Sequence, residues 1–216
     1  GRCGYNETGQ GAYERRRALL HLARLQAGRI GQPINLSDLS SVARIEDLRA
    51  DGILQHARQG ISIRFAHDIF FEWAYFHVLA VRGADWLDEI RASGEPPAVA
   101  RVVELASQWE YVNGAGWRAQ LAQTEASDLR SQWLRAWLVG PFGTAKFEAD
   151  EDQFATAAFA DDFRLFRKAL VWFQAVKTSP NAGILVGPLP EEQRQRWADL
   201  FGVPTDFRAW RRLIDF

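Results

Sequence analysis

The hydrophobic pattern changes its period within residues 61–80, Ile61-Ser62-Ile63-Arg64-Phe65-Ala66-His67-Asp68-Ile69-Phe70-Phe71-Glu72-Trp73-Ala74-Tyr75-Phe76-His77-Val78-Leu79-Ala80. The first five residues alternate apolar and polar, which predicts a strand with Ile61, Ile63 and Phe65 on one face. The apolar residues that follow recur at helical spacing. The sequence therefore predicts a strand that leads into a helix at Ala66-His67-Asp68.

The predicted helix is apolar on almost every side. One side carries Phe70, Trp73, Phe76, His77 and Ala80, and the remaining positions add Ile69, Phe71, Tyr75, Val78 and Leu79. A helix with almost no polar side is typical of one that is covered from several directions. We expect it to lie at the centre of the fold.

Composition indicates a folded protein without a strong charge. The chain has 216 residues, of which 47% are apolar, with nine Trp and fourteen Phe, so it can bury a large core. Its 26 Lys and Arg nearly balance its 27 Asp and Glu, which provides no global field toward nucleic acid or an anionic membrane. One cysteine, Cys3, excludes an internal disulfide and suits a reducing compartment. No apolar run approaches the roughly 20 residues of a membrane span, so we expect a cytoplasmic protein with no membrane contact.

The N-terminal part of the chain has the element order of a winged helix. A flexible lead-in is expected over residues 1–12, followed by three helices, a hairpin and the helix that begins near Asp68. The expected helices are 13–27, 35–39 and one capped by Ser40 or Ser41 with an apolar edge of Val42, Ile45 and Leu48, and the strands are 53–56 and 61–65. Three short helices followed by a two-stranded hairpin predict a winged-helix domain over residues 13–82.

Residues 83–216 predict a helical domain, either a bundle or an array of helix pairs, so the fold class is mainly α. One expected stripe contains Val99, Val102, Val103, Ala106 and Trp109. A second core ridge, in a long helix from about Asp152, contains Phe163, Phe166, Leu170 and Phe173. Pro190 precedes a further helix start.

The sequence offers no candidate for catalysis or metal binding. The four histidines lack a paired ligand spacing, and no G-x-S-x-G motif occurs. Gly4 and Gly9 have the spacing of a phosphate-binding loop, but Gln10-Gly11 follows where Lys and Ser or Thr are needed. The carboxylates of residues 150–152 and 161–162 stand where helix starts favour negative charge, so a capping role is expected of them.

His67 stands at the mouth of the predicted helix. The first backbone N–H groups of a helix lack partners there and the helix dipole is positive, so an imidazole at this place can complete an anion site. Alternatively, His67 caps the helix or forms a hydrogen bond within the domain, with Asp68 satisfying the dipole. His77, further along, is expected to be a core histidine.

Residues 64–74, Arg64-Phe65-Ala66-His67-Asp68-Ile69-Phe70-Phe71-Glu72-Trp73-Ala74, resemble the F-x-H-x-x-[FL]-x-[ED]-[YFW] signature that ends the winged-helix domain of STAND NTPases. These are the NACHT and related signal-transduction ATPases of the AAA+ class. The helix-to-strand segment of residues 47–54 is also similar, and the resemblance covers about residues 13–82. It implies that a winged helix follows a nucleotide-binding core and that His67 contacts the β-phosphate of bound ADP.

The chain departs from that family in lacking G-x-x-x-x-G-K-[ST] and an acidic strand end for magnesium. It is therefore expected to be a non-catalytic regulatory fragment, a winged helix plus the first part of the helical region that binds protein partners. ATP or ADP and Mg²⁺ are implied only for the full-length protein, whose nucleotide-binding module lies upstream.

Two other functions stay open. A winged helix can bind DNA through its third helix, but here Arg44 and Arg49 are accompanied by Glu46, Asp47 and Asp51, and the wing turn has only Arg58, which makes DNA an unfavoured partner. A helical protein-interaction module with no nucleotide role is the other alternative. It predicts that His67 is buried and hydrogen-bonded.

Overall fold

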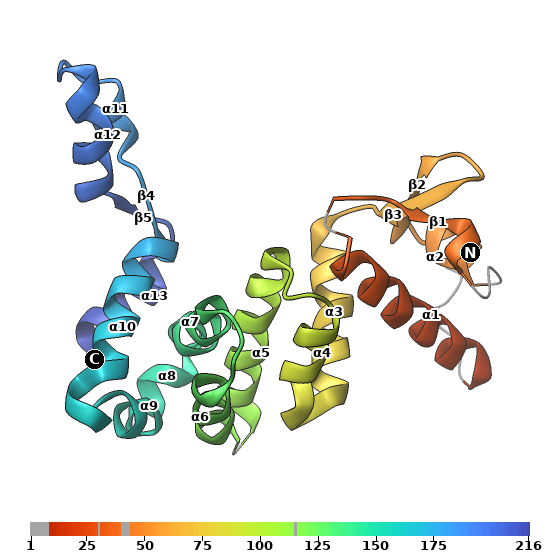
Figure 1. Cartoon of the computed structure of the whole chain (residues 1–216), viewed down its shortest axis with the longest axis horizontal. Coiled ribbons are helices and arrows are strands. Elements are labelled where there is room, and N and C mark those ends of the chain that lie inside the picture. Colours follow the sequence, from red (N-terminus) through yellow and green to blue (C-terminus); the bar gives the residue numbers. More distant parts are fainter. Residues whose placement is uncertain (1–8, 30, 40–43, 115) are drawn as a thin grey trace. The chain divides into compact units, whose positions relative to one another are not determined.

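The computed structural model describes residues 9–29, 31–39, 44–114 and 116–216 (Figure 1). The chain is mainly helical, as predicted. It divides into two compact units, unit 1 with Gly1–Ala106 and Asp128–Gln132, and unit 2 with Ser107–Ser127 and Trp133–Phe216. The expected boundary between residues 82 and 83 falls inside unit 1.

Unit 1 begins with a helix and a small sheet. Its first elements are α1 (Gln10–Ala27), β1 (Ile34–Asn35), the 3-10 helix η1 (Leu36–Asp38), α2 (Ile45–Ala50), β2 (Leu54–Arg58) and β3 (Ser62–Phe65). The antiparallel sheet has the order β1-β3-β2. The expected caps Ser40 and Ser41, and Val42, lie outside the described residues. Strand β1 was not predicted, because two residues are too few to display a period.

The hairpin buries one apolar face. Ile34 is opposite Ile63, Leu54 is opposite Phe65, and all four side chains are buried. The prediction for Ile61 was wrong, because it precedes β3 and its side chain is 58% exposed. Ile61 lies in the turn before β3, where its N–H donates to the Arg58 carbonyl at 3.1 Å, so its side chain is not part of the buried face of the strand.

Helix α3 (Asp68–Arg82) begins where the sequence predicts and ends at Gly83, whose φ of 57° suits glycine. The prediction that this helix is covered from several directions is wrong. The buried side is formed by Ala74, Tyr75, Val78 and Leu79, whereas Ile69 and Trp73 are exposed. Helix α1 packs against α3 (Figure 1). One side of α3 thus carries the packing within unit 1 and another side faces solvent.

A buried carboxylate connects three helices of unit 1. After the 3-10 helix η2 (Gly83–Asp85), α4 (Trp86–Ala92) places Glu89 where Arg24 donates to it at 2.8 Å and Arg82 at 3.0 Å. Two guanidinium groups offset the cost of burying the charge. This cluster explains why residues after Gly83 belong to unit 1.

The 3-10 helix η3 (Pro97–Val99) and α5 (Ala100–Asn113) follow. Val99, Val102, Val103 and Ala106 are buried as predicted, but Trp109 is 53% exposed. Helix α5 continues from unit 1 into unit 2 at residues 106 and 107.

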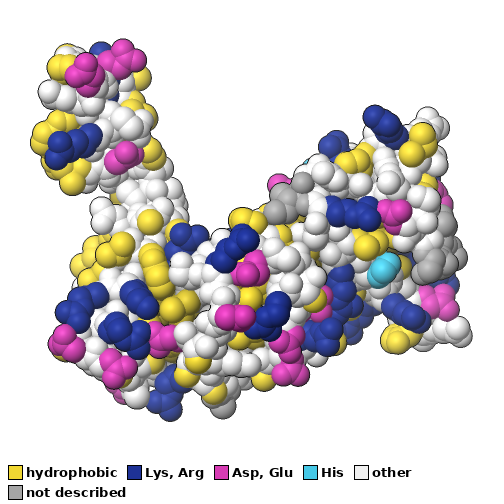
Figure 2. Space-filling view, in the orientation of Figure 1, with side chains coloured by type: hydrophobic (Ala, Val, Ile, Leu, Met, Phe, Trp, Pro, Cys, Tyr) yellow, Lys and Arg dark blue, Asp and Glu magenta, His cyan; other side chains and the backbone are white. Residues whose placement is uncertain are grey.

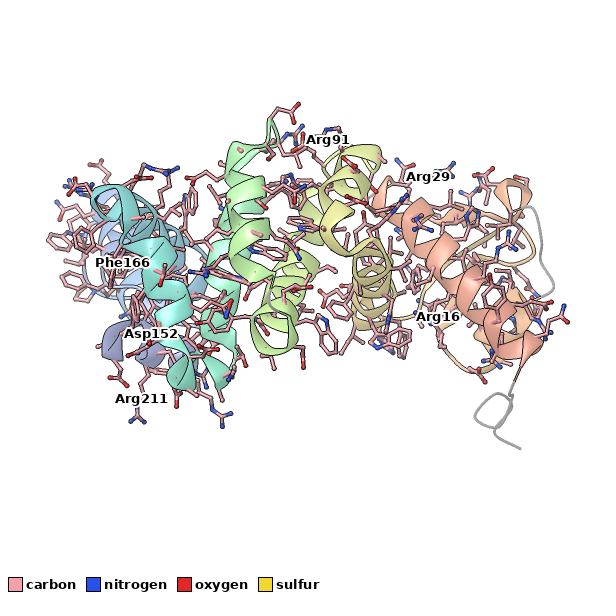
Figure 3. The ribbon with its side chains drawn as sticks, turned by 90° about the horizontal axis from the view of Figure 1, so that it is seen from below. Arg16, Arg29, Arg91, Asp152, Phe166 and Arg211 are labelled. Carbon is pink, nitrogen blue, oxygen red and sulfur yellow. The ribbon has the colours of Figure 1, made fainter. Side chains whose placement is uncertain are left out.

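Unit 2 is helical with one small two-stranded sheet. Its elements are α6 (Trp117–Ala126), α7 (Ser131–Val139, which starts in unit 1), η4 (Gly140–Gly143), α8 (Lys146–Ala149), α9 (Glu151–Ala158), α10 (Ala160–Lys177), β4 (Thr178–Ser179), α11 (Ala182–Leu185), α12 (Glu191–Leu200), β5 (Val203–Pro204) and α13 (Phe207–Asp215). Its core is rich in rings, among them Trp117, Trp137, Phe142, Phe147, Phe154 and Phe173. Phe166 lies in a ring cluster (Figure 3), with centroids 5.5 Å from Phe159 and 5.9 Å from Phe216.

The core ridge predicted in the long helix from Asp152 is confirmed only in part, because Phe173 is buried and Phe166 is half-buried but the other two residues are not. Asp161, Asp162 and Phe163 have left-handed φ of 49°, 54° and 59°, which breaks the helical period between α9 and α10. As a result Phe163 and Leu170 are exposed. The buried side of α10 contains Leu165, Ala169 and Phe173. The helix start after Pro190 is confirmed.

Among the residues that the structure describes, no helix has both the length and the apolar character needed to span a membrane.

Candidate functional site

His67 is held at the junction of β3 and α3. The N–H of Ala66 donates to the Ile53 carbonyl at 2.9 Å, and the His67 carbonyl accepts from the N–H of Phe70 at 3.1 Å. His67 itself is extended, with φ −142° and ψ 148°, at the N-cap position of α3. The backbone on both sides of this residue is therefore fixed by regular hydrogen bonds.

The ring of His67 is exposed and does not cap the helix. It makes no side-chain capping hydrogen bond, and it contacts the Phe70 ring at a centroid distance of 5.7 Å. The alternative in which the His67 side chain caps α3 is thus not supported. Asp68 stands in the first turn, where its negative charge complements the helix dipole.

The outward face of α3 starts two residues after His67. We use this name for the exposed side chains of Ile69, Trp73, Ala80 and Val81. Ile69 is 67% exposed and Trp73 is 55% exposed, which is unusual for side chains of this size so close together. The hydrophobic pattern predicts a covered side for Trp73 and Ala80, because helical spacing alone does not tell which side meets the neighbouring helices.

His77 lies at the edge of the outward face. Its ring centroid is 4.3 Å from that of Trp73 and 5.6 Å from that of Phe76. Burial lowers the pKa of His77, and the nearby charge of Arg16 on α1 lowers it further (Figure 3). His77 is half-buried, so the prediction of a core histidine is only partly met.

A cavity of 620 Å³ opens beside the first turns of α3. Ala66 and Asp68, the neighbours of His67, line it, together with the end of α1 and residues of β2 and β3. The sequence does not predict this cavity, since it is formed by segments far apart in the chain. The pairing of Gln55 with Arg64 across β2 and β3 is found only in the structure.

The cations around α2 are paired with acidic side chains. Arg44 contacts Glu14 at 3.1 Å and Asp47 at 3.0 Å, and these two carboxylates raise its pKa, Asp47 the more strongly. Arg49 contacts Glu46 at 2.7 Å. On the face drawn in Figure 2, basic and acidic side chains are interspersed over unit 1. No basic surface is thus built from α2.

The remaining ionisable groups are dispersed. His21 is exposed on α1, and His56 is half-buried on β2. Within the described ranges, no group of three His, Cys, Asp or Glu side chains could hold a metal ion. Asp150 precedes α9, and Asp161 stands in the first turn of α10, as the sequence predicts, but neither helix has a side-chain capping hydrogen bond at its N-cap residue.

No family model matches the chain, and neither the curated proteins nor the solved structures contain a match.

Proposed function

We propose that residues 13–82, which lie within unit 1, form the winged-helix domain of a STAND-class signal-transduction ATPase, and that this domain senses the nucleotide state of a P-loop module through His67. The order of α1, β1, η1, α2 and the β2–β3 hairpin supports the winged helix, as does the pairing of β1 with β3. The helical residues 83–216 supply contacts with protein partners. The chain itself is regulatory and has no catalytic role.

The observation that carries this proposal is the exposed ring of His67 at the start of a 15-residue helix, to which its side chain makes no capping hydrogen bond. A phosphate of bound ADP would meet both the imidazole and the N–H groups of Asp68 and Ile69, since the N–H of Phe70 already donates to the His67 carbonyl. The negative charge of Asp68 opposes this contact. A phosphate accompanied by the cations of a P-loop module would offset that repulsion.

The outward face of α3 supports a docking role for the same helix. Ile69 and Trp73 would be covered when a protein module reaches His67. Tryptophan is enriched among the residues that dominate protein interfaces, because it buries a large area with few rotatable bonds. One helix then provides both the phosphate contact and the apolar contact.

DNA binding is less well supported. The arginines of the candidate recognition helix are engaged by Glu14, Asp47 and Glu46, so phosphate contacts would first require breaking these pairs. A salt titration with a DNA duplex tests this alternative. We expect no saturable binding, whereas a micromolar Kd that weakens steeply with salt would favour a DNA-binding regulator.

The other alternative, a helical interaction module with no nucleotide role, predicts a buried and hydrogen-bonded His67. The exposed ring of His67 argues against an interaction module in which this histidine is buried and hydrogen-bonded. Protein contacts by unit 2 are common to both proposals. Exposed apolar side chains there, such as Leu200, Phe201 and Phe207, support them.

The test starts from the reading frame upstream of Gly1. It is expected to encode a P-loop module, and the longer protein is then used to compare the ADP affinity of wild type, His67→Ala and His21→Ala. His67→Ala should weaken ADP binding by about tenfold, within the usual range for one charge-assisted hydrogen bond, and His21→Ala should not. An upstream frame without a P-loop, or equal affinities, would overturn the proposal.

A further inference from the structure

The cavity beside α3 has an apolar wall and a polar wall. Its apolar part is formed by Pro33, Phe65, Phe71 and Ala98. The ring centroids of Phe65 and Phe71 are 5.8 Å apart in an edge-to-face contact, which fixes both rings. The volume of 620 Å³ lies within the range of small-molecule sites, about 300–1,000 Å³.

The positive charge at this cavity is Arg64 of β3. With the Gln55 amide oriented to satisfy both groups, its Oε1 accepts from Arg64 Nε at 3.0 Å and from Nη2 at 3.2 Å. This neutral partner orients the guanidinium without cancelling its charge. Within the described part of the chain, Arg64 makes no ion pair with a carboxylate. Its remaining donors are available to an anionic group.

The acceptor groups at the cavity come from two helices. Asp68 and Glu72 lie one turn apart on α3, and in the described ranges neither has an ion-pair partner. At the end of α1, the Gln26 amide nitrogen donates to the Gln32 carbonyl at 3.3 Å, while its Oε1 is buried without a hydrogen-bond partner. The C-terminal end of α1 also has the negative end of the helix dipole. A cationic ligand group would satisfy these acceptors.

We propose that this cavity binds a small zwitterion of the amino-acid class. Arg64 takes the carboxylate, while Glu72, Asp68 and Gln26 Oε1 surround the ammonium group, and the apolar wall takes the side chain. A simple anion would be repelled by two carboxylates. A simple amine would make no contact with the Arg64 donors that Gln55 leaves available, so a ligand with both charges fits the walls best. This proposal does not rest on the nucleotide role of His67, although Asp68 lies beside both sites.

The test titrates the isotope-labelled chain with L-leucine, N-acetyl-L-leucine and L-leucinamide, and follows backbone and Arg64 Nε–H resonances. L-leucine should cause saturable shifts in residues 55–72. Each capped derivative lacks one charge and should bind about tenfold more weakly. The absence of saturable shifts with L-leucine, or equal affinities for the three probes, would overturn the proposal.

Two variants test the ammonium contact and the carboxylate contact of the ligand separately. Glu72→Gln should weaken the probes that carry an ammonium group, and Arg64→Gln those that carry a carboxylate. Glu191→Gln and Arg196→Gln, exposed on α12, are the matched controls and should change nothing. Where a variant disturbs the hairpin, the comparison of the three probes on wild type still decides the outcome.

Discussion

Histidine is a poor N-cap residue. His67 occupies the N-cap position of α3 without a capping hydrogen bond from its side chain, so the ring can make another contact. Serine, threonine, asparagine and aspartate cap a helix because a short side chain places an oxygen over the first N–H groups. The imidazole of His67 instead turns toward Phe70 and solvent. The first turn of α3 thus keeps N–H groups that a ligand or a docking module can use.

Tyr75 provides a pH test of the packing between α3 and α4. Burial raises its pKa to about 12, and its hydroxyl is 2.8 Å from Ser93 Oγ. The unfolded chain loses this proton near pH 10 while the folded chain keeps it, so the contribution of Tyr75 to stability is complete below pH 10 and falls as pH rises toward 12. Between pH 9 and 11, wild type should lose about 1 kcal/mol more than Tyr75→Phe in urea unfolding. Parallel curves for the two proteins would contradict the burial of this hydroxyl.

At the scale of the element, α3 has two sides that the sequence does not distinguish. The change of period correctly predicts where the helix begins, because residues 61–65 alternate and those after 66 do not. It does not predict which side is buried, since Trp73 and Tyr75 are both large and aromatic. Contacts with α1 and α4 decide this, and they depend on residues distant in sequence.

Two valines of α3 test the assignment of its sides. Val78 is fully buried and Val81 is 63% exposed, so they form a matched pair on one helix. Val78→Ala should lower the free energy of unfolding by about 1–3 kcal/mol through lost burial and a residual cavity. Val81→Ala should change it by less than about 0.5 kcal/mol. Equal losses in chemical denaturation would show that both sides of α3 are covered.

The start of α10 carries local strain. Asp161 has a φ of 49°, and a glycine tolerates this conformation more easily. Asp161→Gly should therefore stabilise the chain or leave its stability unchanged. Asp152→Gly, in the first turn of α9, should destabilise it by up to about 1 kcal/mol. Calorimetric melting compares the two variants, and a larger loss from Asp161→Gly would refute the left-handed turn.

At the scale of the molecule, the sequence predicts the mainly helical class but not the division into units. The apolar patterns after Gly83 are helical in both units, so nothing in them marks residues 106 and 107 as a boundary. Glu89 joins the region after Gly83 to α1 and α3 through Arg24 and Arg82, a contact that sequence spacing does not predict. The cavity beside α3 was missed for the same reason.

We propose that the outward face of α3 docks on a nucleotide-binding module next to His67. Carbene footprinting of Ile69 and Trp73 tests it most directly, in this chain alone and in the longer ADP-bound protein. Trp197 on α12 and Val186 after α11 are the reference side chains. Labelling of Ile69 and Trp73 should fall severalfold in the longer protein. Unchanged labelling of both side chains in the ADP-bound protein would contradict it.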